Sequence, residues 1–386
     1  MFKTHQGVVE EEAALVRQLE KLVRDTLDED RSVPVPWLVA LSTYMTLNTL
    51  SRAERLLEQQ WPEPVMALLA LQIIEPTAEH LYQENIPCLT TLDDNTSSLV
   101  RKQYEENPYP RWIKAAPVAK QRSIDQVIKA LHPGSSFRPL HVPNPDILVA
   151  GCGTGQHPLE TARHFPTAKV LAIDLSLASL GYAIRKTQEL GIENLQYAQA
   201  DLTQLSSIDR QFDIIESIGV LHHLDKPVAG LQTLVSLLRP NGLLKLGLYS
   251  ECARQHVAAA RAYISERGYK PSVKDIRRCR QDLRTFGDQD FRKQVTNFSD
   301  FFSVSGCRDL LFHVQEHRLT IPIIAEWLQK FDLTFIGFNT SPELKAAFRR
   351  RFPDPASESD LGLWHSFEEE NSTAFIEMYQ FWAQRR

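Results

Sequence analysis

Hydrophobic and polar positions form alternating blocks in the middle of the chain, and the blocks predict strands and helices in turn. Short apolar runs bounded by glycine, proline or acidic residues are typical of buried strands, and they occupy 147–150, 169–174, 195–200, 212–217 and 243–249. Helical spacing fills the intervals, at 156–164, from 176 to near 191, and at 226–238, with a turn at 239–242. Strands that alternate with helices indicate a parallel sheet wound on both faces, with right-handed crossovers.

The segments on either side of this alternation are helical in pattern. Residues 8–96 have the spacing of short helices, and those at 37–47 and 65–74 each begin behind a proline. A polar hinge at 93–98 precedes a helix that runs to about 106. Two amphipathic helices after the fifth strand are marked by Val257, Ala260, Ile264, Ile276, Cys279, Leu283 and Phe286. A helix at 322–331 and strands at 333–338 and 373–382 then restore the sheet.

These patterns predict three parts of the chain. An N-terminal helical domain occupies 1–96, a linker occupies 97–120, and an α/β domain occupies 121–386 with a helical insert at about 251–319. An insert that follows the fifth strand begins at the carboxyl edge of the sheet, where open α/β sheets bind their ligands. We therefore expect the insert to contribute to substrate recognition.

The first predicted strand runs into a loop of alternating glycines, Gly151, Gly153 and Gly155, ahead of a predicted helix. Glycine lets the backbone turn sharply and approach a ligand, and a strand end that faces a helix N-terminus is where open sheets hold nucleotide-like ligands. A dinucleotide-binding loop needs a further glycine at the position of Gln156, so the spacing favours a different ligand. A tight turn that binds nothing is the alternative.

Two acidic residues follow the next two predicted strands. Asp174 ends the second strand, 23 positions after Gly151, where a carboxylate can accept hydrogen bonds from ribose hydroxyls. Asp201 ends the third strand, where its carboxylate can accept a hydrogen bond from an adenine amino group. Each could instead cap the helix that follows it. Both acids behind one glycine loop favour a nucleoside site.

Five segments resemble successive motifs of the class I S-adenosylmethionine-dependent methyltransferases, and they lie at 149–155, 172–174, 200–201, 218–224 and 238–242. The segment 104–112 is similar to a Y-x-x-x-P-Y-P-R-W element found ahead of the catalytic domain in a group of bacterial methyltransferases. The resemblance implies a Rossmann-like, doubly wound, seven-stranded sheet whose last strand is antiparallel. It also implies S-adenosylmethionine as cofactor, S-adenosylhomocysteine as product, and methyl transfer to a nucleophilic acceptor. The cofactor-binding residues that it indicates are Gly151, Cys152, Gly153, Gly155, Asp174, Leu175, Asp201, Leu202, Glu216 and Arg111.

The candidate catalytic residues are His222, His223 and Tyr104. Methyl transfer from a sulfonium is an in-line displacement, so alignment matters most and a base is needed only for a protonated acceptor. The two histidines follow the fourth strand, and either could act as base or only pack beneath the cofactor. Tyr104 belongs to a segment of aromatic residues and prolines that suits either a lid over the cofactor or a pin that holds the linker to the core. The N-P-P-Y element of amide- and adenine-methylating relatives is absent after the fourth strand.

The amino-acid composition limits the expected class of protein, its partners and its location. The 386 residues are 43% hydrophobic and 24% charged, the balance of an ordinary globular protein, and the net charge of −5 is dispersed, which argues against a nucleic-acid partner. The five cysteines include no CxxC pair, which favours free thiols in a reducing cytoplasm and argues against a metal site. No apolar run is long enough to span a membrane, so we expect no membrane partner and a cytoplasmic location.

Other interpretations stay open at this point. The chain could be a nucleotide-dependent oxidoreductase, or a scaffold that binds the cofactor without turnover. The acceptor could be a small molecule, although the helical N-terminal domain favours a protein or peptide. Two charged clusters lie in the insert. The first could be a solvated helix face or a patch for an anionic substrate, and consists of Arg277, Arg278, Arg280 and Arg284. The second could form helical salt bridges or line the acceptor side of the site, and consists, at helical spacing, of Arg308, Asp309, His313, Glu316 and His317.

Overall fold

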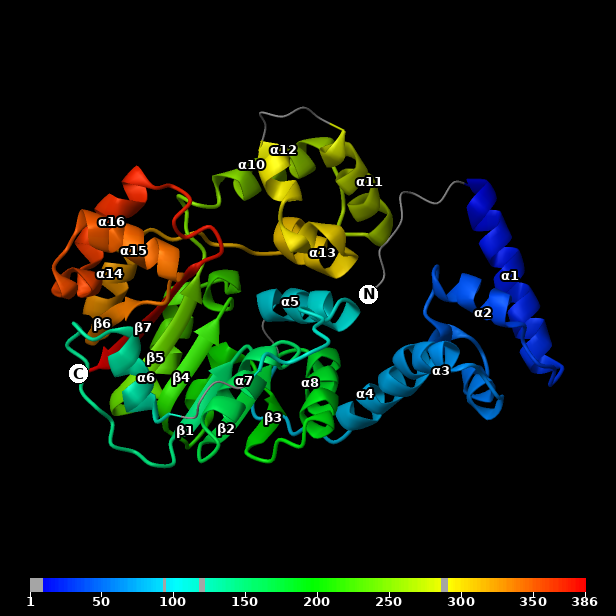
Figure 1. Cartoon of the computed structure of the whole chain (residues 1–386), viewed down its shortest axis with the longest axis horizontal. Helices are drawn as coiled ribbons and strands as arrows, with labels where there is room; N and C mark the ends of the chain where they lie inside the picture. Colours follow the sequence, from blue (N-terminus) through cyan, green and yellow to red (C-terminus); the bar gives the residue numbers. More distant parts are fainter. Residues whose placement is uncertain (1–9, 93–94, 118–121, 286–290) are drawn as a thin grey trace.

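The computed structural model describes residues 10–92, 95–117, 122–285 and 291–386. Its centre is a seven-stranded sheet in the order β3-β2-β1-β4-β5-β7-β6 (Figure 1). The strands are β1 (Asp146–Ala150), β2 (Lys169–Asp174), β3 (Leu195–Gln199), β4 (Phe212–Ile218), β5 (Leu238–Leu248), β6 (Leu333–Phe338) and β7 (Tyr379–Arg385). The first five are parallel, and β7 runs antiparallel to both β5 and β6. The predicted Rossmann-like α/β fold with an antiparallel last strand is confirmed.

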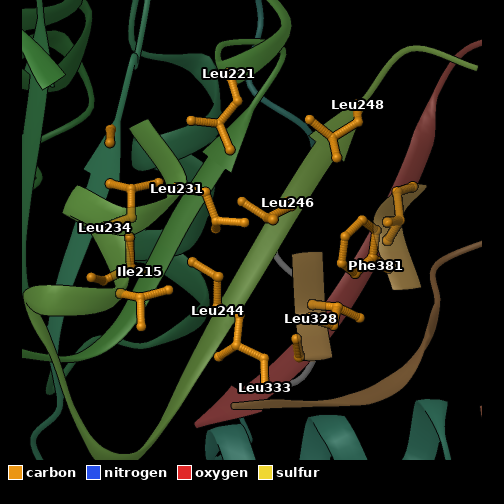
Figure 2. Packing of buried hydrophobic residues seen from close by; sticks show 14 of the residues in the cluster. Ile215, Leu221, Leu231, Leu234, Leu244, Leu246, Leu248, Leu328, Leu333 and Phe381 are labelled. Atoms are coloured by element: carbon orange, nitrogen blue, oxygen red, sulfur yellow. The ribbon is translucent and has the colours of Figure 1, made fainter. Parts of the chain in front are cut away.

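Helices cover both faces of the sheet. One face is covered by α6 (Ile124–Leu131), α7 (Gln156–His164) and α8 (Leu177–Glu189). The other is covered by α9 (Pro227–Ser236), α14 (Ile321–Lys330), α15 (Pro342–Arg351), the 3₁₀ turn Pro355–Ser359 and α16 (Leu361–Glu370). Figure 2 shows the second face, where Leu244 and Leu246 of β5 pack between Leu231 of α9 and Leu328 of α14. Because strand side chains alternate, β1 contributes Ile147 to one core and its neighbour Leu148 to the other.

The N-terminal helices form a unit with its own apolar core. They are α1 (Glu10–Asp28), α2 (Val35–Ser42), the 3₁₀ helices Leu47–Thr49 and Ala53–Glu58, α3 (Glu63–Leu69), the π-helical turn Ala70–Ile74 and α4 (Glu75–Gln83). Helix α4 lies along α8, as Figure 1 shows. The guanidinium of Arg185 in α8 is buried there and pairs with Glu79 at 2.9 Å and with Glu75 at 2.8 Å. The N-terminal unit is therefore joined to the α/β domain by a buried charge network.

A helical insert follows β5, as the sequence predicted. It consists of α10 (Gln255–Arg267), α11 (Val273–Arg284), α12 (Phe291–Thr296), the 3₁₀ turn Ser299–Phe302 and α13 (Val304–Phe312). Its core is separate from those of the sheet and includes Val257, Ile276 and Phe301. Helix α5 (Asn95–Glu106) lies between the insert and the carboxyl edge of the sheet (Figure 1). The insert and α5 thus border the edge where ligands are expected.

Several predicted boundaries are wrong. The predicted turn at 239–242 lies inside β5, where the register with β4 shifts between Phe212 and Ile214 and Asn241 has a φ of 65°. The last strand begins at Tyr379 instead of 373, because residues 373–378 form turns ahead of it. Helix α13 ends at Phe312, so His313, Glu316 and His317 lie beyond it and form no helical salt bridges. Phe286, the hinge residues 93–94 and the boundary at 120 lie outside the described residues. None of the described helices is long and apolar enough to cross a membrane.

Candidate active site

The glycine loop after β1 needs glycine at two positions for different steric reasons. Gly151 has a φ of 77°, and a β-carbon there would lie 2.2 Å from a side-chain methyl of Val220. Gly153 has a φ of 53°, and a β-carbon there would lie 2.9 Å from the carbonyl oxygen of Tyr109. Both positive φ values favour glycine because other residues pay a steric cost in this region. The loop therefore packs closely between the segment that follows β4 and the linker.

Asp174 at the end of β2 holds this loop and faces the same space. Its Oδ2 accepts a hydrogen bond from the Gly153 N–H at 2.8 Å, and its Oδ1 accepts one from Ser176 at 3.0 Å. Burial raises the pKa of the Asp174 carboxyl, while these backbone donors act to lower it. Because a carboxylate oxygen has two lone pairs, each oxygen can accept one more hydrogen bond from a ligand.

Asp201 at the end of β3 offers an acceptor that has no protein partner. Its Oδ1 accepts hydrogen bonds from the backbone N–H and the hydroxyl of Thr203, at 2.8 and 2.7 Å, and so caps the 3₁₀ helix Leu202–Ser207. Its Oδ2 is buried and has no hydrogen-bond partner among the described residues. The capping alternative and the ligand-binding alternative therefore both fit Asp201, one for each oxygen. An unsatisfied buried oxygen is costly unless a ligand donates to it.

A single cavity of about 560 Å³ joins these groups to the insert. Nine of the residues predicted for the site line it: Gly151, Cys152, Gly153, Asp174, Leu175, Asp201, Leu202, His223 and Tyr104. The cavity is also lined by Tyr109 of the linker, Tyr249 after β5, Asp309 of α13 and Met378 before β7. The sequence did not single out Tyr249 or Met378. The position of Tyr249 just after a strand end was the available signal.

Four predicted residues do not line the cavity. Gly155 begins α7, and a β-carbon there would lie 2.5 Å from Ala183 of α8, so this glycine permits close packing of two helices. Arg111 is exposed, with its guanidinium 5.9 Å from the centre of the Tyr182 ring. His222 lies behind Tyr249, and its ring stacks on the tyrosine at 3.8 Å.

Glu216, the fourth of these residues, is fully engaged beneath the glycine loop. Its carboxylate accepts a hydrogen bond from Thr161 at 2.7 Å and pairs with His157 at 2.9 Å and with Lys245 at 3.7 Å. Burial opposes its ionisation, but Lys245 and His157 lower the pKa of Glu216 below its ordinary value. Its position in β4 directs it away from the cavity, towards the face that α7 covers.

The two adjacent histidines belong to the 3₁₀ helix Leu221–His223 and have different surroundings. His222 is fully buried, neither ring nitrogen has a hydrogen-bond partner among the described residues, and burial lowers its pKa. His223 lines the cavity, and its Nδ1 lies 2.7 Å from the carbonyl oxygen of Gln315, so Nδ1 carries the hydrogen and Nε2 keeps its lone pair. Burial lowers the pKa of His223 to about 4. Both rings are therefore neutral at neutral pH.

The insert side of the cavity carries a hydrogen-bonded group of residues from distant segments. The hydroxyl of Tyr104 in α5 donates to Asp309 Oδ1 at 2.7 Å and lies 3.2 Å from His313 Nε2. The His313 ring stacks on His223 at 3.6 Å, and burial lowers the pKa of His313 to about 2. Burial raises the pKa of Asp309 to about 6. The second charged cluster of the insert thus reaches the cavity through Asp309.

The linker after α5 is tied to the core and also borders the cavity. Trp112 Nε1 donates to the Thr154 carbonyl at 3.0 Å, and the Thr154 hydroxyl donates to the Pro110 carbonyl. The Glu105 carboxylate accepts hydrogen bonds from the first two backbone N–H groups of α8, at 2.7 and 3.0 Å. Both predicted roles of the aromatic segment fit this geometry, because Trp112 pins the linker while Tyr104 and Tyr109 line the cavity.

Residues 147–242 match a protein family described as a methyltransferase domain. That segment contains the glycine loop, Asp174, Asp201 and both histidines. The fold is similar to that of PKMT2 from Rickettsia typhi in complex with AdoHcy, with a TM-score of 0.53 at 15% identity, over 72% of this chain and 56% of that chain.

Curated relatives are similar to this chain over limited stretches. An uncharacterized protein of Synechococcus sp. is 31% identical over 206 residues, which is 50% of this chain and 48% of that protein. A malonyl-[acyl-carrier protein] O-methyltransferase of Halalkalibacterium halodurans is 36% identical over 101 residues, which is 25% of this chain and 36% of that protein. The chain therefore spans at most about half the length of these relatives.

The cavity beside the glycine loop offers groups that fit the parts of S-adenosylmethionine. The close backbone of the glycine loop suits the methionine end, the free lone pairs of Asp174 suit the ribose hydroxyls, and Asp201 Oδ2 suits the adenine amino group. Gln156, which lines the cavity, occupies the position where a dinucleotide-binding loop has glycine. Among the described residues, no group of three or more His, Cys, Asp or Glu side chains is placed to hold a metal ion.

Proposed function

We propose that this chain transfers a methyl group from S-adenosylmethionine to a nucleophilic acceptor that enters from the side of the insert. The observation that carries the proposal is the single cavity that joins the glycine loop, Asp174 and Asp201 to Tyr104, His223 and Asp309. One end has the groups that suit an adenosyl cofactor, and the other end is lined by side chains from the linker and the insert. A cofactor and an acceptor bound at the two ends would face each other within one enclosed space.

The chain's own residues have distinct parts in this reaction. Asp174 and Asp201 bind the nucleoside, and the backbone of Gly151, Cys152 and Gly153 shapes the loop beside it. When bound, S-adenosylmethionine supplies a methyl group on a cationic sulfur that leaves as a neutral sulfide. The walls of the cavity exclude water and align the acceptor, which is the main catalytic contribution expected for an in-line displacement.

Of the predicted catalytic residues, we assign His223 and Tyr104 to the acceptor end and His222 to packing behind it. His223 Nε2 has a free lone pair and the ring lines the cavity, so it can orient a donor group of the acceptor. Tyr104 keeps its proton, because burial raises the pKa of its hydroxyl well above the ordinary value. It therefore acts as a hydrogen-bond donor to Asp309 and not as a base.

We further propose a protein or peptide as acceptor. The cavity mouth is bordered by three separate segments, the linker, α5 and the insert, which together offer surface for a macromolecule.

Incorporation of a labelled methyl group from S-adenosylmethionine tests both parts of the proposal. Purified protein is incubated with the labelled cofactor and a cell lysate depleted of small molecules, with the Asp174→Ala variant as control. We expect label in macromolecules with the wild type only, and release of the label as small fragments by a protease. Label that appears only when the small-molecule fraction is restored would contradict the protein acceptor. No label in either fraction would contradict methyl transfer.

A further inference from the structure

The acceptor end of the cavity contains a buried carboxylate that no cation of the described residues neutralises. Asp309 is 8% exposed and lines the cavity, and it receives a hydrogen bond from the Tyr104 hydroxyl. The structure gives Asp309 no ion pair with any described residue. Arg254, whose charge acts on Asp309 from a distance, has its guanidinium paired with Glu316 at 3.0 Å. A buried anion without a partner is unfavourable unless a ligand supplies the opposite charge.

The groups around Asp309 are neutral and aromatic. Tyr104, Tyr109 and Tyr249 all line the cavity, and burial raises the pKa of each hydroxyl, so all three keep their protons. His223 and His313 are uncharged at neutral pH, because burial lowers the pKa of both rings. The faces of tyrosine rings attract cations within about 6 Å. The surroundings therefore favour a cationic ligand beside Tyr104 and Tyr109, whereas Tyr249 already has the Arg254 guanidinium 3.5 Å from its ring centre and the His222 ring stacked on it at 3.8 Å.

We propose that the methyl acceptor is an aliphatic amine, which binds as its ammonium ion to Asp309 beside the Tyr104 and Tyr109 rings. This inference rests on the methyltransferase function proposed above and specifies the acceptor of that same site. An alcohol or a carboxylate acceptor would leave the Asp309 charge without a partner or would repel it. The tyrosine hydroxyls can accept the remaining N–H hydrogens of the ammonium.

The reaction balances with groups that the site contains. The bound ammonium transfers one proton to the Asp309 carboxylate, which leaves a lone pair on the amine nitrogen. That pair forms the new nitrogen–carbon bond while the sulfur–carbon bond breaks, and its electrons remain on sulfur as S-adenosylhomocysteine is released. The product is the methylated ammonium ion, and Asp309 loses its proton to solvent. Asp309 is a better proton acceptor here than His223, because burial raises its pKa to about 6 and lowers that of His223 to about 4.

Binding of n-butylamine to the protein saturated with S-adenosylhomocysteine tests the proposal, with n-butanol as the neutral analogue. We expect the amine to bind at least about tenfold more tightly than the alcohol, since a charge-assisted contact is lost with the alcohol. Asp309→Asn is expected to reduce amine affinity by about tenfold or more. The amide oxygen of the substituted side chain would still accept the Tyr104 hydrogen bond, so the cavity keeps its shape in this variant.

Asp300→Asn is the matched control. Asp300 accepts a hydrogen bond from the Tyr109 hydroxyl at 2.9 Å but does not line the cavity, so amine affinity should stay within about twofold of wild type. Equal binding of amine and alcohol, or unchanged amine affinity in Asp309→Asn, would overturn the proposal. If wild type binds S-adenosylhomocysteine but no amine, only the acceptor assignment fails. If it binds no S-adenosylhomocysteine, the methyltransferase function itself fails.

Discussion

At the scale of residues, the glycine loop and the two strand-end carboxylates shape the part of the cavity proposed to bind the cofactor. A β-carbon on Gly151 would collide with Val220, and the Asp174 carboxylate fixes the loop through the Gly153 N–H. Asp201 uses one oxygen for the protein and leaves the other unsatisfied. Each of these residues can be substituted to test its role in ligand binding, because none of the hydrophobic cores is built from them.

Gly151→Ala should reduce S-adenosylmethionine affinity by about tenfold or more and lower stability. The positive φ costs roughly 1 kcal/mol, and the contact with Val220 forces the loop to move. Gly191→Ala is the matched control, because Gly191 has a φ of 62° but nothing within 4 Å of a β-carbon. Calorimetric titration and thermal unfolding of both variants provide the comparison. Equal loss of affinity in the two variants would exclude the steric explanation.

His132 should make the protein less stable in mild acid. Burial lowers its pKa to about 4 from 6.5, so between these pH values the unfolded chain binds more protons than the folded chain. Stability contributed by His132 is therefore complete above pH 6.5 and is lost as the pH falls to about 4, by up to roughly 3 kcal/mol. Urea unfolding of wild type and His132→Gln across this range should show their difference shrinking as the pH falls. A constant difference would contradict this account.

At the scale of elements, α5 connects the cofactor site to the insert. Its Glu105 caps the N-terminus of α8, Tyr104 reaches Asp309 of α13, and Glu106 pairs with Arg308 of α13 at 2.6 Å. These three consecutive residues contact both sides of the cavity. Helix α5 lies between the insert and the sheet (Figure 1) and lines the cavity through Ser97, Val100 and Tyr104.

Glu105→Ala should loosen α5 without unfolding the sheet. The substitution leaves two backbone N–H groups of α8 without their carboxylate, at a cost of about 1 kcal/mol. Glu106→Ala removes an ion pair whose carboxylate is half exposed, although Arg308 is largely buried, and should cost about 1 kcal/mol or less. Hydrogen exchange of α5 should accelerate in Glu105→Ala and change little in Glu106→Ala. The reverse order would show that α5 is held mainly by the insert.

The sequence predicted the elements whose patterns are local. Strands β1 to β4, the helices between them and both site acids follow from apolar runs and strand-end positions. Helices α15 and α16 were not predicted, because they lie in a stretch between the last two strands that no motif marked. The role of Glu216 depends on which face of the sheet its side chain points to, and the role of His222 depends on the Tyr249 ring that it stacks on. The spacing of residues along the sequence does not reveal either. Asp309 could be placed at the cavity only once α13 was positioned against α5.

At the scale of the whole molecule, the N-terminal helices and the α/β domain share a buried charge network. The Arg185 guanidinium of α8 pairs with Glu79 and Glu75 of α4 and lies 5.0 Å from the centre of the Tyr182 ring. Residues 87–89 continue this contact beside β3, since the Leu89 N–H donates to the Gln199 carbonyl at 2.9 Å. The N-terminal unit therefore contacts the α/β domain through residues that precede the predicted boundary at 96.

Arg185→Met should uncouple these two units. Removal of the guanidinium leaves the largely buried Glu79 carboxylate without a partner, at a cost of about 3 kcal/mol. We expect α4 to lose hydrogen-exchange protection while the sheet keeps its own. Arg24→Met, which removes a partly exposed ion pair within α1, is the control and should cost less than about 1 kcal/mol. Equal destabilisation by the two variants would contradict a special role for Arg185.

The central claim is that the cavity beside the glycine loop binds S-adenosylmethionine. Calorimetric titration of the full chain with S-adenosylmethionine, S-adenosylhomocysteine and NADH tests it most directly, with Asp174→Ala in parallel. We predict binding of the first two at about micromolar affinity, no binding of NADH, and a loss of about tenfold or more in the variant. Binding of NADH alone, or binding of S-adenosylmethionine that Asp174→Ala leaves unchanged, would contradict the account.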